Sequence, residues 1–403
     1  MGYFEIDPLL ETMLDLAPDI SDLNLSVGRP PQVEVDGQLR PVPFSGLEKL
    51  LPYHTEIVAM RLLGGKRDLV DKLVRTGSTD LSYSLARRTR FRVNIFSQRG
   101  SLSIVLRVIP NRVPTVENLG LPQQLNEITR ERNGIVLVTG PTGSGKSTSL
   151  AAIIDKINRE QAIHIITIED PIEYLHLHKQ ATINQRELGS DTQSFALALR
   201  AALRQAPKVI LVGEMRDVDT ISIALEASET GHLVLSTLHT IDAAKTIDRI
   251  VGVFPKNEER QIRTRFSQAF KWVVSQRLVP KVGGGRVALC EILRSTSRTR
   301  EYVLEGEREG RSLIDAMNDG LLEGMQSFDY ELERLINVGV IDREVGLSYA
   351  TNRTNLQLRL DTQGAGDASP SAAATAGKPA LSRPARQTAA PSASLDLDDL
   401  IER

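Results

Sequence analysis

One glycine-rich stretch of the sequence combines the residue types that bind phosphate. It lies between an apolar segment, 135–138, and a segment that favours a helix, 148–158. Glycines let successive backbone N–H groups converge on phosphate oxygens, and a helix N-terminus adds partial positive charge. The pattern G-x-x-x-x-G-K-S therefore predicts a P-loop that binds a nucleoside triphosphate. The expected nucleotide-binding residues are Gly140, Pro141, Thr142, Gly143, Ser144, Gly145, Lys146, Ser147 and Thr148.

Two residues at the end of this loop carry functional groups that nucleotide chemistry requires. We expect the Lys146 ammonium to reach the β and γ phosphates as a catalytic group, and the Ser147 hydroxyl to ligate Mg²⁺. A chance glycine-rich turn is a poor alternative, because the strand, the loop, the lysine and the serine occur together.

Hydrolysis also needs a carboxylate that orients or deprotonates water. The apolar segment 209–212 is followed by Gly213 and Glu214, a Walker-B-like arrangement that predicts Glu214 beside the P-loop. A second expected strand, 165–168, ends in Glu169 and Asp170. A helix cap would explain Asp170 about as well. Two such strands after a P-loop nevertheless favour acids that bind a metal ion and position water. Glu169 and Glu214 are the expected metal-site acids beside Ser147.

Two of the six histidines, His232 and His239, flank the short apolar segment 233–235. A lone histidine usually packs or caps a helix. Because these two bracket one expected strand that ends in hydroxyl side chains, we interpret both as nucleotide-sensing residues.

The elements that must position these residues indicate an α/β fold. Residues 1–109 read as a small α+β domain, with expected hairpins at 32–39 and 90–107. The segment 110–122 contains three prolines and reads as a linker. From 123 to 360, short β-branched runs alternate with amphipathic stretches, typical of buried parallel strands between helices. We expect this region to become helical from about Pro255, and residues 361–403, rich in Ala, Ser and Pro, to form a disordered tail.

Composition excludes several other classes of protein. The 403 residues carry a formal net charge of −2 and only 4% aromatic side chains, which disfavours a nucleic-acid partner or a motor that stacks on single-stranded DNA. The single cysteine, Cys290, excludes a disulfide framework and a four-cysteine zinc site. No apolar run approaches the ~20 residues of a membrane span. We therefore expect a soluble, cytoplasmic protein without direct membrane insertion.

At these motifs the sequence resembles the secretion ATPase superfamily of bacteria, and specifically the PilT/PilU family of type IV pilus retraction, or twitching motility, ATPases. The resemblance extends from about residue 20 to about residue 347. Its motifs stand in the family's order: the P-loop, the Asp box, the Walker B region and the His box, at 140–148, 168–173, 213–217 and 231–239.

The resemblance implies a homohexameric ring of subunits, each with a PAS-like N-terminal domain and a RecA-like core. It implies ATP hydrolysis that drives domain rotation, which an inner-membrane platform protein converts into pilus disassembly. The protein would then sit at the cytoplasmic face of the inner membrane through that partner, and a paralogous retraction ATPase is a further expected partner.

The same resemblance assigns roles to individual residues. Glu214 would be the catalytic glutamate, Glu169 a second active-site acid, and His232 would couple the γ phosphate to ring conformation. Arginines of the N-terminal domain would stabilise charge on the phosphates, and Arg92 and Arg107 are the candidates. Ordinary solvation of an exposed strand face explains these two arginines equally well.

The sequence departs from the family pattern at three places. Lys208 stands where the family usually has aspartate, Asn24 replaces a common histidine, and the retraction motif at 298–303 keeps only its arginine. Segments 205–207 and 275–280 look more like the PilU side of the family. An accessory subunit that binds ATP beside a principal motor therefore remains an alternative. An assembly or type II secretion ATPase is disfavoured, because those proteins generally carry a four-cysteine zinc element.

Overall fold

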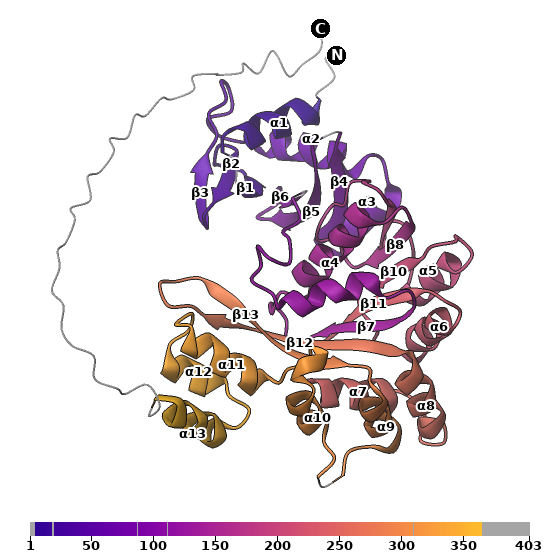
Figure 1. The fold of residues 1–403 in the computed structure, drawn as a ribbon. Coiled ribbons are helices and arrows are strands. Elements are labelled where there is room, and N and C mark those ends of the chain that lie inside the picture. Colours follow the sequence, from indigo (N-terminus) through magenta and orange to yellow (C-terminus); the bar gives the residue numbers. More distant parts are fainter. Residues whose placement is uncertain (1–4, 18–19, 87, 111, 309, 365–403) are drawn as a thin grey trace, which may run out of the picture. The chain divides into compact units, whose positions relative to one another are not determined.

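The computed structural model describes residues 5–17, 20–86, 88–110, 112–308 and 310–364, which form two compact units (Figure 1). The first unit lies within Met1–Pro110 and the second within Asn111–Pro370. The division falls beside the domain boundary expected after residue 109. Most of the expected tail, residues 365–403, lies outside the described residues.

The first unit is built on an antiparallel sheet of six strands in the order β3-β2-β1-β6-β5-β4. The hairpin expected at 32–39 is present, and its turn residues Asp36 and Gly37 both have positive φ, as an Asp-Gly turn favours. The elements are α1 (Ile6–Asp15), β1 (Ile20–Leu25), β2 (Gln32–Val35), β3 (Gln38–Pro41), α2 (Pro52–Leu63), α3 (Arg67–Thr76), β4 (Ser78–Leu85), β5 (Thr89–Gln98) and β6 (Ser101–Ile109).

The second unit contains a seven-stranded sheet in the order β13-β12-β7-β11-β10-β8-β9, parallel except for β13. Its strands are β7 (Gly134–Thr139), β8 (His164–Glu169), β9 (Thr182–Glu187), β10 (Val209–Val212), β11 (Leu233–Leu238), β12 (Phe270–Pro280) and β13 (Arg286–Arg294). Around it lie η1 (Gln123–Arg130), α4 (Lys146–Glu160), α5 (Phe195–Ala202), α6 (Val218–Glu229), α7 (Ala243–Gly252), α8 (Glu259–Ala269), α9 (Ser297–Glu305), α10 (Leu313–Asp319) and η2 (Leu321–Glu323). The α/β fold class is confirmed.

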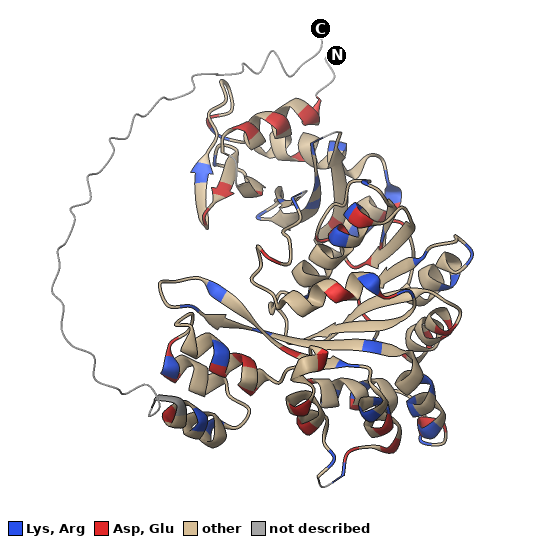
Figure 2. Ribbon diagram, viewed as in Figure 1, with Lys and Arg blue, Asp and Glu red and all other residues tan. Residues whose placement is uncertain are grey.

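Both faces of this sheet are covered, which explains why its central strands are continuously apolar. Alternate side chains of β7 enter two cores: Ile135 and Leu137 pack with α5 to α8, whereas Val136 and Val138 pack with α4 and η1. Strands β7, β10 and β11 contain no charged residue (Figure 2). The apolar pattern thus reports burial on two sides, as in other parallel sheets.

The C-terminal part of the second unit differs from the prediction of a helical region beginning near Pro255. Strands β12 and β13 interrupt it, because the buried residues of 270–280 pair with β7 on one side and with β13 on the other. Helices α11 (Phe328–Asn337), α12 (Arg343–Tyr349) and α13 (Arg353–Gly364) follow and share a small core with β12 and β13. Helix α13 continues to Gly364, so the tail predicted from residue 361 begins too early.

The segment predicted as a linker is also partly structural. Val116 and Leu121 are buried in the core that contains α4 and η1, so this part of 110–122 is packed into the second unit. Across the described ranges, no helix combines the length and apolar character that crossing a bilayer requires.

Candidate active site

The carboxyl ends of four neighbouring parallel strands bring the predicted residues together. The P-loop follows β7, His239 follows β11, Glu214 lies just beyond β10, and Glu169 is the last residue of β8. The sheet order β7-β11-β10-β8 therefore places His239 between the P-loop and Glu214. This edge of an open parallel sheet is where ligands bind in such folds.

Two glycines of the P-loop, Gly140 and Gly145, pack tightly against β12. A Cβ atom at Gly140 would lie 2.2 Å from the backbone oxygen of Gln276, and one at Gly145 would lie 2.8 Å from its side-chain Nε2. Between them, the Ser144 hydroxyl is buried and finds no hydrogen-bond partner among the described residues. A glycine-shaped loop with an unpartnered buried hydroxyl fits the binding of phosphate oxygens.

Lys146 is the first residue of α4 and is buried. Its Nζ donates to the carbonyl oxygens of Gly140 (2.9 Å) and Pro141 (3.1 Å), so the ammonium lies over the loop. Burial lowers the pKa of Lys146, and the negative charge of Glu214 opposes that shift. The next residue, Ser147, is exposed, and its hydroxyl is accessible to a ligand.

Glu214 makes contacts on two sides. Its Oε2 lies 2.5 Å from the Arg216 guanidinium and 3.5 Å from Nε2 of His239. The other ring nitrogen of His239, Nδ1, lies 3.4 Å from the Thr142 hydroxyl in the P-loop. His239 thus links the Walker B acid to the phosphate-binding loop through both ring nitrogens.

Glu169 is held by two neutral donors. The Thr167 hydroxyl donates to its Oε1 at 2.6 Å, and Nε2 of Gln185 donates to the same oxygen at 3.1 Å. Burial raises the pKa of Glu169, and these hydrogen bonds offset part of that shift. Glu169 lies close to Gly213, the residue before Glu214. A carboxylate of raised pKa is suited to accepting a proton from water.

His232 lies apart from the P-loop within one subunit. It precedes β11, and its backbone oxygen accepts from the N–H of Gly134 at the first residue of β7. His232 and the P-loop are therefore at opposite edges of the sheet, separated by a six-residue strand, or about 20 Å. Its Nδ1 hydrogen-bonds the Ala227 carbonyl at 2.9 Å, so within one subunit the ring has a helix-end role instead of a phosphate contact.

Lys208 lies at the same remote edge. Its N–H donates to the carbonyl of His164, at the start of β8. The departure from the family's usual aspartate therefore does not alter the acids at the carboxyl ends of β8 and β10.

Arg92 and Arg107 belong to the first unit, where they are directly paired across β5 and β6. Both are exposed. Nε of Arg107 donates to Asp22 at 2.9 Å, whereas Arg92 has no ion-pair partner among the described residues.

Three further residues contribute to the site without belonging to a predicted motif role. Gln276 contacts the P-loop from β12, Gln185 orients Glu169 from β9, and Arg216 pairs with Glu214. Gln276 and Gln185 act through contacts between separate strands, for which a sequence has no local pattern. Arg216 lies two residues from Glu214, and its charge beside the Walker B acid was the available signal.

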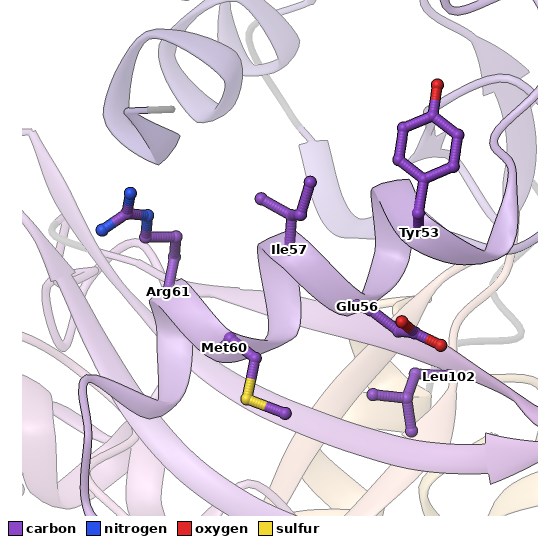
Figure 3. Close-up of a pocket in the computed structure, with 6 residues that line it drawn as sticks. All are labelled: Tyr53, Glu56, Ile57, Met60, Arg61 and Leu102. Carbon is purple, nitrogen blue, oxygen red and sulfur yellow. The ribbon is translucent and has the colours of Figure 1, made fainter. Parts of the chain in front are cut away.

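The first unit also contains a surface cavity of about 610 Å³ that is distinct from these residues. Figure 3 shows that its side chains come mainly from α2. The lining is largely apolar, with one carboxylate from Glu56 and one guanidinium from Arg61. Its residues are Tyr53, Glu56, Ile57, Met60, Arg61 and Leu102.

Within the described part of the chain, no cluster of three or more His, Cys, Asp or Glu side chains is arranged to hold a metal ion. Any metal at this edge would need additional oxygen ligands, such as the Ser147 hydroxyl and phosphate oxygens.

The fold and the site define a P-loop nucleotide-binding protein with a parallel sheet. The family model for "Type II/IV secretion system protein" matches residues 33–325, and the chain belongs to this family. The chain is 45% identical over 324 residues to the type IV pilus retraction ATPase PilT of Pseudomonas aeruginosa, covering 80% of this chain and 92% of that protein. It is 37% identical over 369 residues to the type IV pilus ATPase PilU of the same organism, covering 90% and 93%.

Solved structures agree with this assignment. A crystal structure of the pilus retraction motor PilT with bound ADP superposes with a TM-score of 0.77 at 41% identity, covering 88% of this chain and all of that one. The ATPase DotB of Legionella pneumophila superposes with a TM-score of 0.71 at 31% identity, covering 84% and 94%. The resemblance to the PilT/PilU family is confirmed.

Proposed function

We propose that this chain is the subunit of a homohexameric motor that hydrolyses ATP to drive type IV pilus retraction, and with it twitching motility. The observation that carries the proposal is the continuous contact from Thr142 through His239 to Glu214 at the carboxyl edge of the sheet. The 45% identity to a retraction ATPase over most of both chains supports it.

In the proposed reaction, the P-loop N–H groups and Lys146 hold the phosphates of ATP. Glu214 accepts a proton from the attacking water, and its contact with Arg216 holds the carboxylate in place for that step. His239 contacts both Glu214 and the P-loop and so couples their positions. Glu169 acts as a second acid near the water. The products are ADP and phosphate.

Mg²⁺ would be held by Ser147 together with Glu169 and Glu214, and when bound it would neutralise phosphate charge during hydrolysis. We further propose that the first unit is the family's PAS-like domain. Arg92 is the better of its two candidate arginines for a phosphate of a neighbouring active site, because Arg107 is already engaged by Asp22.

The proposed partners follow from the proposed role. They are further copies of this chain in a ring, an inner-membrane pilus platform protein, and a paralogous retraction ATPase. The motor would then work in the cytoplasm, against the inner membrane, through the platform protein and without inserting into the bilayer itself.

A deletion strain complemented with the wild-type gene or with Glu214→Gln tests the role in the cell. Retraction predicts that deletion leaves surface pili present but abolishes twitching, and that only the wild-type gene restores it. Loss of surface pili on deletion would instead indicate an assembly motor and would contradict the proposal.

A second candidate function is an accessory subunit, similar to PilU, that supports a principal motor without being the main hydrolase. The PilU relative favours it, since that alignment covers 90% of this chain against 80% for the PilT relative. Full twitching with Glu214→Gln, in a strain where deletion abolishes it, would select the accessory role.

A further inference from the structure

Gln276 is a buried polar residue that touches the P-loop from a neighbouring strand. It lies on β12, directly after Ser275, which pairs with Thr139 at the end of β7. Only 2% of Gln276 is exposed. The residue is therefore enclosed at the point where β7 gives way to the phosphate-binding loop.

Both functions of the Gln276 amide are used. Nε2 donates to the backbone oxygen of Ser144 at 2.7 Å, and Oε1 accepts from the Ser149 hydroxyl on α4 at 2.8 Å. A backbone carbonyl can only accept, so the NH₂ group must face Ser144, while a hydroxyl can donate to the remaining oxygen. Chemistry thus fixes the orientation of the amide.

This contact determines the direction of one P-loop N–H group. The peptide between Ser144 and Gly145 is planar, and in a trans peptide the carbonyl and the following N–H point in opposite directions. With the Ser144 carbonyl held toward β12, the Gly145 N–H points to the opposite side of the peptide. The contact is close, since even a Cβ at Gly145 would lie 2.8 Å from Nε2 of Gln276.

We propose that Gln276 is a positioning residue for nucleotide binding: by anchoring the Ser144 carbonyl, it aims the Gly145 N–H at a phosphate of the nucleotide, with Ser149 bracing the amide. This rests on the proposed function, in that the P-loop holds ADP and ATP. Gln276 itself does not touch the nucleotide.

The variant Gln276→Glu removes the donor and keeps the size of the side chain. At pH 8 its carboxylate faces the Ser144 carbonyl, the two oxygens repel, and the loop loses its orientation. We expect the Kd of a fluorescent N-methylanthraniloyl-ADP to rise about tenfold, the scale of one hydrogen bond to a charged group. As the pH falls, a protonated carboxyl donates in place of the amide, so affinity should recover relative to wild type.

Gln326→Glu is the matched control. Gln326 is also buried, and its Nε2 donates to a backbone oxygen, that of Cys290, at 2.8 Å. It bridges Ile292 of β13, which is one strand further from the P-loop than β12. This variant should lower the thermal midpoint without ADP but leave the Kd within twofold of wild type.

Ser149→Ala keeps the measurement decisive if Gln276→Glu does not fold. It removes only the brace on Oε1, and we expect a Kd about threefold weaker with little change in the thermal midpoint. If Gln276→Glu folds and binds ADP with wild-type affinity and a wild-type pH profile, the proposal is overturned. If Gln276→Glu does not fold, unchanged ADP affinity in Ser149→Ala overturns it. A wild-type protein that does not bind the ADP analogue would instead contradict the proposed function.

Discussion

The Nε2 atom of His239 lies 3.5 Å from the Glu214 carboxylate, and Nδ1 of the same ring lies 3.4 Å from the Thr142 hydroxyl. One side chain therefore contacts both the acid proposed to activate water and the loop proposed to hold phosphate. This relationship follows from the sheet order, since β11 lies between β7 and β10.

His239→Ala should lower steady-state ATP turnover by about 10- to 100-fold, because Glu214 loses its link to the P-loop. Thr142→Val, which removes only the hydroxyl, should cost less. His232→Ala is the control: its ring lies at the other edge of the sheet, and turnover should stay within twofold of wild type. Equal losses for His232→Ala and His239→Ala would contradict the assignment.

Glu169→Gln should raise stability while lowering activity. Burial raises the pKa of Glu169, so ionisation of this carboxyl destabilises the folded state. The contribution of Glu169 to the free energy of unfolding therefore falls as the pH rises through the folded pKa. The amide oxygen of the substituted side chain can still accept from Thr167 and Gln185. At pH 8 we expect a higher thermal midpoint by circular dichroism and turnover reduced about tenfold or more. Unchanged turnover would remove Glu169 from the site.

Asp155, on the helix that follows the P-loop, should stabilise the fold above pH 4. Burial alone would raise its pKa, but contacts with His176 and Lys179 and the charge of Arg159 lower it to about 2. The shift from 3.8 corresponds to about 2 kcal/mol. The folded pKa is depressed, so this contribution is present above the unfolded value and is lost as the pH falls through about 2.

Asp155→Asn should therefore lower the thermal midpoint by roughly 4–8 °C at pH 7. The difference from wild type should narrow once the pH drops below 4. A difference that is constant between pH 7 and pH 3 would show that the ion pairs of Asp155 do not stabilise the fold.

Gly140→Ala should abolish ADP binding, because its Cβ would lie 2.2 Å from a backbone oxygen of β12. Gly189→Ala provides the comparison. Gly189 also has positive φ, at +81°, but a Cβ there meets no atom within 4 Å. It should cost only about 1–2 kcal/mol in backbone strain and leave ADP affinity unchanged. Isothermal titration calorimetry of both variants measures the affinities, and normal binding by Gly140→Ala would show that the loop can move away from β12.

Much of the site was predictable because it depends on strand ends. A P-loop, an acid after β10, an acid at the end of β8 and a histidine after β11 all follow short apolar runs, and parallel strands bring their carboxyl ends to one edge. The same rule separates His232 from His239, since one precedes and the other follows β11. Strand direction therefore places His239 beside the P-loop and His232 at the opposite end of β11 within one subunit.

Other features depend on contacts that local patterns do not contain. Gln276 reaches the P-loop across more than 130 residues of sequence, and its amide has no spacing that marks it. Strands β12 and β13 depend on pairing of 270–280 with β13 and with β7, which is a distant segment. The surrounding region is otherwise rich in helices, so a local pattern favours a helical region there. The tail was predicted to begin at 361, but Leu356 and Leu360 are buried in the core with α11, which keeps α13 helical to Gly364.

Steady-state ATP turnover of the wild-type protein and of Glu214→Gln, with ADP affinity measured on both, tests whether Glu214 activates the attacking water. We expect turnover by wild type, a loss of at least about 100-fold in the variant, and ADP affinity within a few-fold of wild type. Equal turnover in the two proteins would contradict the assignment of Glu214 as the residue that activates water.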